Sequence, residues 1–233
     1  MMPPSPLRFF LAVRLHAPYA LVVLAGVAAV AVWTVALSPS ELDSGLGMVL
    51  FIQIFLASSG FVPAARRGHF DPLLAGSYGR TPVAMAHWLV SIGPGVAAWA
   101  IITGVAWGVG SPAAPSAIAG QRAAALFIVS ALAWSVGFAF TRGAAGVGWI
   151  AALVVLLVRH VSPIAVTDSG AAPSVFTVLR HAATLMLCPF LLIGPAPAVA
   201  VGSVPIAVAA SMALLIAICR FADRVDVPLR SDV

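Results

Sequence analysis

The feature that most constrains this chain is a series of apolar segments that contain no Asp, Glu, Lys or Arg. Several of them approach about 20 residues, the length at which a helix crosses the roughly 30 Å hydrocarbon core of a bilayer. Only 8% of the residues are charged, whereas water-soluble domains carry about 25%. Short segments of alternating polarity, which a membrane β-barrel needs, are absent. The sequence therefore predicts an all-α membrane protein with a single transmembrane domain over residues 1–233.

We expect about six transmembrane helices, because six segments reach or approach the length needed to span a bilayer. These segments are residues 19–37, 46–63, 83–109, 123–140, 144–158 and 205–221. Residues 7–18 mix arginine with phenylalanine and leucine, a pattern typical of a helix that lies in the membrane interface. The third span is long enough to tilt, or to kink at Pro94 and its flanking glycines. Residues 182–204 are apolar but rich in proline, which predicts a re-entrant segment or a broken helix before the last span.

The twelve basic residues are all arginine, and their positions indicate the topology. With six spans and a cytoplasmic N-terminus, nine arginines lie inside and three outside, as the positive-inside rule expects. The inside set is Arg8, Arg14, Arg66, Arg67, Arg80, Arg142, Arg220, Arg224 and Arg230, and the outside set is Arg122, Arg159 and Arg180. A seventh full span would divide them six and six. We therefore expect six spans, both termini in the cytoplasm, and Glu41 and Asp43 outside.

The sequence offers few groups for chemistry inside the membrane. It contains no lysine, and the phosphate-binding loops of ATPases need one, so we expect no ATP site in this chain. The first five predicted spans hold no ionisable Asp, Glu or Arg, which argues against an ion-coupled carrier or proton pump. Metalloprotease and serine-hydrolase motifs are also missing. We therefore expect no enzyme activity and no bound cofactor, and we interpret Cys188 and Cys219 as buried free thiols.

Three histidines leave open the alternative of a membrane enzyme or a haem-handling protein. His87 stands beside Trp88 near the start of the third predicted span, and tryptophan favours that interfacial depth. His160 and His181 flank the predicted external loop, residues 159–181, and could share a metal ion or a haem. A membrane enzyme or a haem-handling protein would require at least one of these histidines.

The connector between the second and third predicted spans, residues 64–82, combines charged and apolar groups more than a simple turn requires. Asp71 can cap a helix, Pro72 fits the first helical position, and Gly76 can end the helix. The sequence therefore predicts a short amphipathic helix on the cytoplasmic side, a surface that another protein could bind. The alternative is a turn that lies on the membrane.

At this connector the sequence resembles the ABC-2 type transporter permease family. After their second span, such subunits often carry a glycine, a small insert and two leucines. An arginine and a new span then follow. The matching residues here are Gly68, His69, Phe70, Asp71, Pro72, Leu73 and Leu74, followed by Gly79 and Arg80 and the span that begins at Val83. Arg67 stands where the family often has an acidic residue. The connector with His87, Trp88 and Pro94 is also similar to the haem-exporter permease of cytochrome c maturation.

The resemblance implies a coupling helix that docks on a nucleotide-binding ATPase subunit through Gly68, His69, Phe70, Asp71, Leu73, Leu74 and Arg80. ATP and Mg would then belong to that partner, and a second permease copy or a similar chain would complete the path. The family implies an exporter in the cytoplasmic (inner) membrane of a prokaryote, in contact with lipid and not with nucleic acid. A scaffold subunit that transports nothing is the alternative from another class.

Overall fold

The structure is a computed structural model and describes residues 5–16, 19–58, 73, 78–110, 116–139, 174–193 and 202–221. All secondary-structure elements within these residues are helices, with no strand among them. The α-helices are α1 (Pro6–His16), α2 (Tyr19–Leu37), α3 (Leu42–Ser58), α6 (Arg80–Gly108), α7 (Ser116–Ala139), α9 (Val175–Leu187) and α10 (Ser203–Phe221). Two short 3-10 helices, η1 (Pro39–Glu41) and η2 (Pro189–Leu192), complete the described elements.

Three of these helices are long and apolar enough to cross a membrane, and they lie at Arg80–Gly108, Gly120–Phe138 and Ser203–Phe221. Shorter apolar helices occur at Val22–Leu37, Leu42–Ser58 and Val175–Leu187. The all-helical character expected from the sequence is thus confirmed for the described part of the chain, and three of its helices have the length and apolar composition that crossing a membrane requires. The predicted span at residues 144–158 lies outside the described residues, so the number six stays a prediction.

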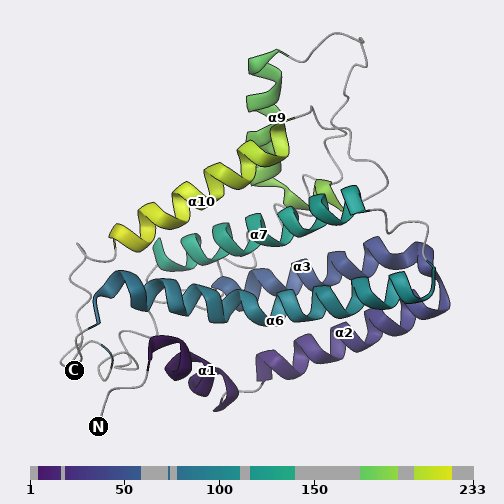
Figure 1. Cartoon of the computed structure of the whole chain (residues 1–233), viewed down its shortest axis with the longest axis horizontal. Coiled ribbons are helices and arrows are strands. Elements are labelled where there is room, and N and C mark those ends of the chain that lie inside the picture. The colour runs from purple at the N-terminus through teal and green to yellow at the C-terminus, as the bar shows by residue number, and fades with distance from the viewer. Residues whose placement is uncertain are drawn as a thin grey trace.

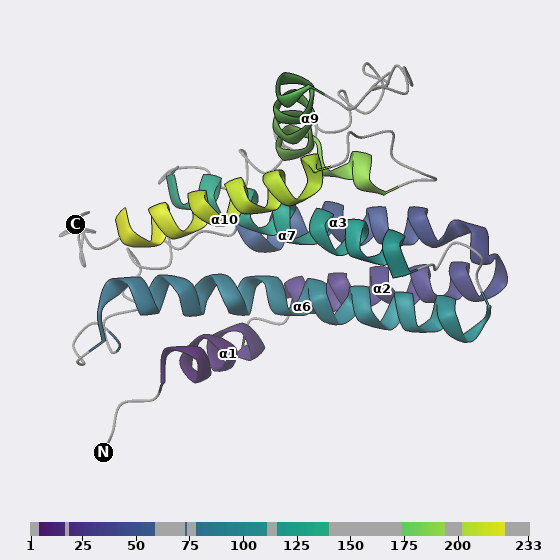
Figure 2. The ribbon, with the colours of Figure 1, turned by 45° about the horizontal axis from the view of Figure 1, so that its top comes forward.

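The long helices lie side by side in an elongated bundle (Figure 1). Helix α3 occupies its middle, where it packs against α2, α6 and α7. Helix α10 lies on α7 at one side, and α1 lies on α6 at the other (Figure 2). Helix α9 is the exception, because it stands steeply to the rest of the bundle beside the start of α10 (Figures 1 and 2).

Two glycines allow neighbouring helices to approach closely. A Cβ atom on Gly45 of α3 would lie 3.1 Å from the Cβ of Ala31 on α2. A Cβ on Gly137 of α7 would lie 2.6 Å from the backbone oxygen of Ser58, at the end of α3. Such small-residue contacts are a common way for helices to associate in lipid, where apolar burial alone gives little preference for a neighbouring helix.

Several helices begin earlier than the sequence predicts, among them α3 at Leu42 and α6 at Arg80, and two of them begin well inside predicted connections. Helix α7 begins at Ser116, between the predicted spans at residues 83–109 and 123–140. Helix α9 begins at Val175, inside the predicted loop at residues 159–181, because the Ser174 hydroxyl caps it by accepting from the Thr177 amide at 3.2 Å.

Proline has different effects in two helical regions. Helix α6 continues through Pro94 without interruption. Helix α9 ends at Leu187, and η2 begins at Pro189, so residues 182–193 are not one continuous α-helix. Whether the whole segment 182–204 re-enters or crosses the membrane stays a prediction, because part of it lies outside the described residues.

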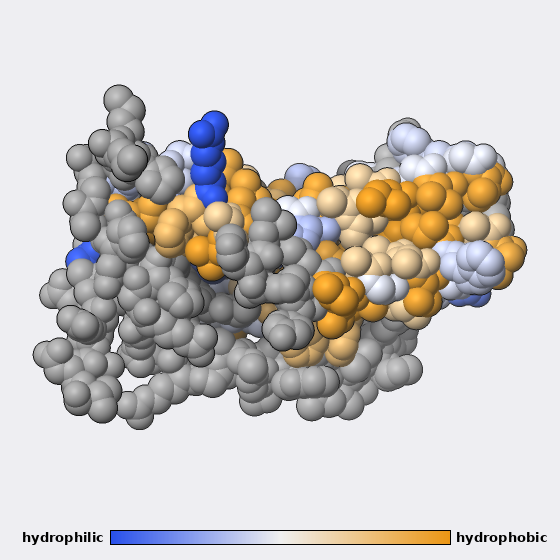
Figure 3. Space-filling model, turned by 90° about the horizontal axis from the view of Figure 1, so that it is seen from below, coloured by the Kyte–Doolittle hydropathy of each residue, from blue (hydrophilic) through white to orange (hydrophobic). Residues whose placement is uncertain are grey.

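The outer surface of the bundle is strongly apolar. Seen from below, the described surface around α2 and α6 is covered mainly by hydrophobic residues (Figure 3). Large exposed side chains on these two helices are Val22, Val23, Val30, Trp33, Leu37, Met85, Leu89, Val96, Ile101 and Trp107. A surface of this kind is unfavourable in water and suits contact with lipid chains.

The contact at Gly137 can be tested against a matched glycine on the same helix. Gly137→Ala should lower the melting temperature of the purified chain, because overpacking a close contact typically costs about 1–3 kcal/mol. Gly120→Ala is the control, since no atom lies within 4 Å of its added Cβ. The measurement is the fraction of monodisperse protein that remains after heating, read by size-exclusion chromatography. Equal melting temperatures for the two variants would contradict the packing described here.

Candidate functional site

The two ends of the bundle differ in charge. The start of α6 carries Arg80, the end of α10 carries Arg220, and α1 carries Arg8, and these helix ends gather at one end of the bundle (Figure 1). We call it the arginine end. The opposite end holds Glu41 and Asp43 near the start of α3, and we call it the acidic end.

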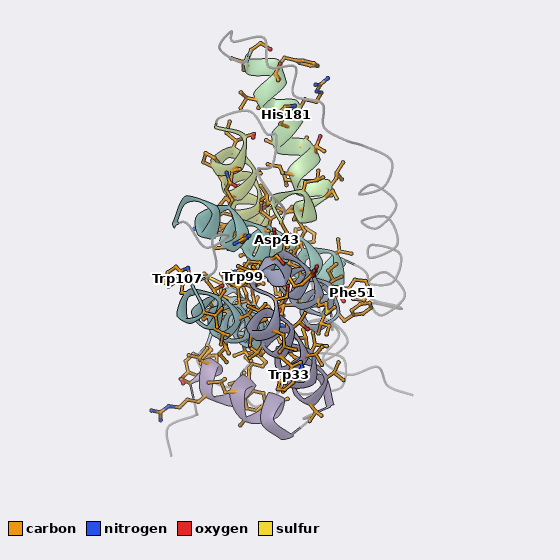
Figure 4. The ribbon with its side chains drawn as sticks, turned by 90° about the vertical axis from the view of Figure 1, so that its right-hand side faces the viewer. Trp33, Asp43, Phe51, Trp99, Trp107 and His181 are labelled. Atoms are coloured by element: carbon orange, nitrogen blue, oxygen red, sulfur yellow. The ribbon has the colours of Figure 1, made fainter. Side chains whose placement is uncertain are left out.

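Helix α6 connects these two ends and matches the thickness of a bilayer. From Arg80 to Trp107 a helix rises about 40 Å, close to the roughly 40–45 Å of a bilayer with its headgroup regions. Trp107 is 57% exposed and Trp33, near the end of α2, is 69% exposed. In a view along the bundle from the acidic end, Trp107 lies at the outer edge and Asp43 lies toward the middle (Figure 4). Exposed tryptophans at a helix end favour the membrane–water interface.

A buried apolar cluster closes the arginine end. Its members come from α1, α3, α6, α7 and α10, and also include one residue of the connector between α3 and α6. They are Phe10, Ala57, Leu73, Val83, Ala84, Ala86, Val90, Trp134, Phe138, Leu215 and Cys219. Leu73 is fully buried in this cluster, at 0% exposure. Of the connector residues that the structure describes, Leu73 is thus buried within the bundle.

A hydrogen bond ties the start of α6 to the end of α10 beside this cluster. The Thr81 hydroxyl donates to the Cys219 carbonyl oxygen at 3.2 Å. Tyr78, just before α6, packs against the same cluster. The start of α6 and the end of α10 are thus held together at the arginine end.

The structure locates only part of the predicted coupling segment. Leu73 lies in the core, so its side chain anchors the segment and is not available to a partner. Arg80 is half-buried in the first turn of α6. The remaining predicted docking residues, Gly68, His69, Phe70, Asp71 and Leu74, lie outside the described residues.

His87 contacts residues from two other helices at the arginine end. Its Nδ1 atom accepts a hydrogen bond of 2.9 Å from the indole nitrogen of Trp134 on α7. The Phe10 ring of α1 packs edge-on against the imidazole, with 5.2 Å between ring centroids. His87 therefore joins α1, α6 and α7, a role that its sequence position beside Trp88 does not reveal.

A third polar contact between helices joins α3 to α6 near Pro94. Gln53 is fully buried, and its amide nitrogen donates to the Ser91 carbonyl oxygen at 3.0 Å. The amide oxygen of Gln53 faces Gly95, where a side chain would overlap it. The absence of a side chain at Gly95 therefore leaves room for the Gln53 amide against α6, and a larger residue there would displace the amide.

An ion pair joins α3 to α7 at the acidic end. The Arg122 guanidinium donates to the Asp43 carboxylate, and the side chains are 4% and 25% exposed, respectively. Asp43 stands in the first turn of α3, where the helix dipole favours a negative charge. Both residues are expected on the external side from the sequence, but their pairing could not be predicted, because nothing in the sequence brings residues 43 and 122 together.

The metal or haem alternative depends on histidines of which the structure describes two, His87 and His181. No group of three His, Cys, Asp or Glu side chains suited to a metal ion occurs among them. His181 is buried in α9, and His160 lies outside the described residues. Cys188 and Cys219 are free and buried, which confirms that prediction.

We compared the chain with protein-family models, with curated proteins and with solved structures, and none of the three comparisons gives a match.

The hydrogen bond between Trp134 and His87 can be measured with a double-mutant cycle. Trp134→Phe removes the donor, His87→Phe removes the acceptor, and the double variant corrects for the change in packing. We expect a coupling of about 0.5–1.5 kcal/mol, the usual net contribution of a hydrogen bond, measured from unfolding in mild detergent. Trp88→Phe is the control, because the Trp88 indole nitrogen is buried and has no hydrogen-bond partner among the described residues. A coupling of zero would contradict the assigned bond.

Proposed function

We propose that this chain is the membrane-spanning permease subunit of an ATP-driven ABC-2 type transporter. A separate nucleotide-binding subunit would bind ATP and Mg, hydrolyse the ATP and act on the connector between α3 and α6. A second permease copy or a similar chain would complete the path. The resemblance of the connector to the ABC-2 type permeases favours export across the cytoplasmic (inner) membrane of a prokaryote.

The observation that carries the proposal is the anchoring of the connector at Leu73. A coupling segment must transmit force to the bundle, and a segment held only by its two ends would bend instead. Leu73 is buried among residues of five helices, so a displacement at this point reaches all of them. The Thr81 bond to Cys219 adds a direct link from α6 to α10.

The polarity of the bundle interior supports an amphipathic cargo. Buried polar side chains in the described spans are mainly serines and the Gln53 amide, and Arg122 carries the one full charge buried among the described residues. Hydroxyl and amide groups can contact a lipid-like or peptide cargo without the desolvation cost of a buried charge. An ion would need fixed charges or a ring of aligned oxygen atoms.

The charge at the two ends supports an orientation with the arginine end in the cytoplasm. Arg8, Arg80 and Arg220 lie at this end, and cytoplasmic loops carry an excess of arginine in membrane proteins. Glu41 and Asp43 would then face the outside.

The proposal predicts a stable complex with an ATPase. Affinity purification of the tagged chain in mild detergent, followed by mass spectrometry, should recover an ATPase subunit in a fixed ratio. The neighbouring reading frame should encode a protein with a lysine-bearing phosphate loop. A chain that purifies alone, even after cross-linking through residues 64–82, would contradict the proposal and favour a scaffold role.

The docking surface can be separated from the anchor by two substitutions. Phe70→Asp should abolish co-purification of the ATPase while the chain remains inserted and monodisperse. Leu73→Asp should instead reduce the amount of folded chain, because it places a carboxylate in the buried cluster. Leu73→Met is the matched control and should retain both folding and the complex. Unchanged ATPase binding in Phe70→Asp would remove this residue from the docking surface.

The orientation can be tested with single cysteines at exposed positions near the two ends. Glu41→Cys should react with an impermeant maleimide added to intact cells, and Arg220→Cys should react only after the cells are opened. Both positions are exposed, and the two natural cysteines are buried. The reverse pattern would mean that the arginine end faces outward.

A further inference from the structure

We propose that Asp43 and Arg122 form a reversible ionic clasp that holds the acidic end of the bundle closed, and that Ser58 and Gly137 form the pivot about which this end opens. Only the purpose of this opening, as a step in a transport cycle, rests on the proposed function. The clasp and the pivot themselves are argued from contacts between α3 and α7.

The geometry of α3 and α7 places the two contacts at opposite ends of one interface. The helices run in the same direction, from the acidic end to the arginine end (Figure 1). Asp43 meets Arg122 near their beginnings, and Ser58 meets Gly137 near their ends. The two contacts are 15 residues apart on each helix, from residue 43 to 58 on α3 and from residue 122 to 137 on α7. At about 1.5 Å per residue the contacts lie about 22 Å apart.

The contact at Gly137 has the properties of a pivot. The Gly137 Cα lies directly against the backbone of Ser58, so that even a Cβ would be 2.6–3.0 Å from the Ser58 oxygen, carbonyl carbon and Cα. No flexible side chain separates the two helices here. A backbone contact of this kind fixes the distance between helix axes while leaving the helices free to tilt.

The contact at Asp43 has the properties of a clasp that can open. The Arg122 side chain is 4% exposed, so it stays in the protein, but Asp43 is 25% exposed and already meets solvent. Water can therefore solvate the carboxylate as the helices part, which keeps the cost of separation moderate. Tilting α3 about the pivot by about 10° would part the pair by about 4 Å, a motion in the range of ordinary helix movements.

The interface between clasp and pivot is apolar and permits this motion. On α3, Leu46, Leu50 and Ile54 follow the same helix face as Asp43 and Ser58 by their spacing. They belong to the buried cluster that also contains Ala125 and Val129 of α7. Apolar contacts are non-directional, so these side chains can shift without breaking hydrogen bonds.

The experiment uses two reporter cysteines in the full chain, purified into lipid nanodiscs without any ATPase. Ala125→Cys lies one turn from Arg122, and Ala57→Cys lies beside the pivot; both alanines are buried. Cys188 and Cys219 are replaced by alanine in each chain. The readout is the rate of reaction with a charged thiol reagent, which enters only where the helices separate.

Asp43→Asn should raise the reaction rate of the cysteine at position 125 by about tenfold. This is the factor expected from the loss of one interaction energy of ordinary size between two side chains. The rate at position 57 should change less than about twofold, since the pivot is retained. Glu41→Gln, which removes an exposed charge two residues away, should leave both rates unchanged. Exchanging the charges, with Asp43→Arg and Arg122→Asp together, should return the rate at position 125 toward its original value.

Equal increases at both reporters would show general loosening and overturn the proposal, as would unchanged rates at both. If the Asp43→Asn chain fails to fold, the salt dependence of the unaltered clasp replaces it. Raising ionic strength from about 0.05 to about 1 M should then increase the rate at position 125 selectively, because salt screens a partly exposed pair; no selective increase would overturn the clasp. These outcomes do not depend on an ATPase, so failure of the clasp and failure of the transport proposal are distinguishable.

Discussion

Hydrocarbon gives helices no hydrophobic reason to prefer one another over lipid, so this bundle depends on close backbone contacts and a few bonds between helices. Helix α3 makes most of them. It approaches α2 at Gly45, contacts α7 at Gly137, and is bonded to α6 through Gln53 and to α7 through Asp43. The outer helices can therefore expose apolar side chains to lipid on one face and still be held on the other.

The polar contacts lie at different depths and have different consequences. At the acidic end, the pair of Asp43 and Arg122 is partly exposed and open to exchange with water. In the middle, Gln53 is fully buried, and breaking its bond to the Ser91 carbonyl would leave an amide in an apolar interior. At the arginine end, the bond between Trp134 and His87 lies in the cluster that holds Leu73. The middle and the arginine end are thus held more firmly than the acidic end.

Much of this organisation could be predicted from the sequence, because hydrocarbon thickness and charge impose strong rules. Uncharged segments located the three long apolar helices that the structure describes, and Arg80 and Asp43, predicted on different sides, lie at opposite ends of the bundle. The partners of side chains could not be predicted, since helical periodicity says which face is apolar but not which helix covers it. Trp134 is the clearest case. The sequence indicates only a buried aromatic residue at this position, and its bond to His87 follows from the packing of α7 on α6. The extension of α9 to Val175 depends on one cap at Ser174, a local signal within a segment that otherwise resembles a loop.

The position of Pro94 suggests how the two ends of the bundle communicate. Proline removes a backbone donor, and glycine on either side adds freedom, so α6 alone would be weakest at this point. Gln53 braces the same turn from α3, with its amide on the Ser91 carbonyl and against Gly95. A displacement of the connector would enter α6 near Arg80 and meet this brace before it reached Trp107. Gln53 therefore links the turn of α6 that contains Pro94 to α3, the helix that carries Asp43.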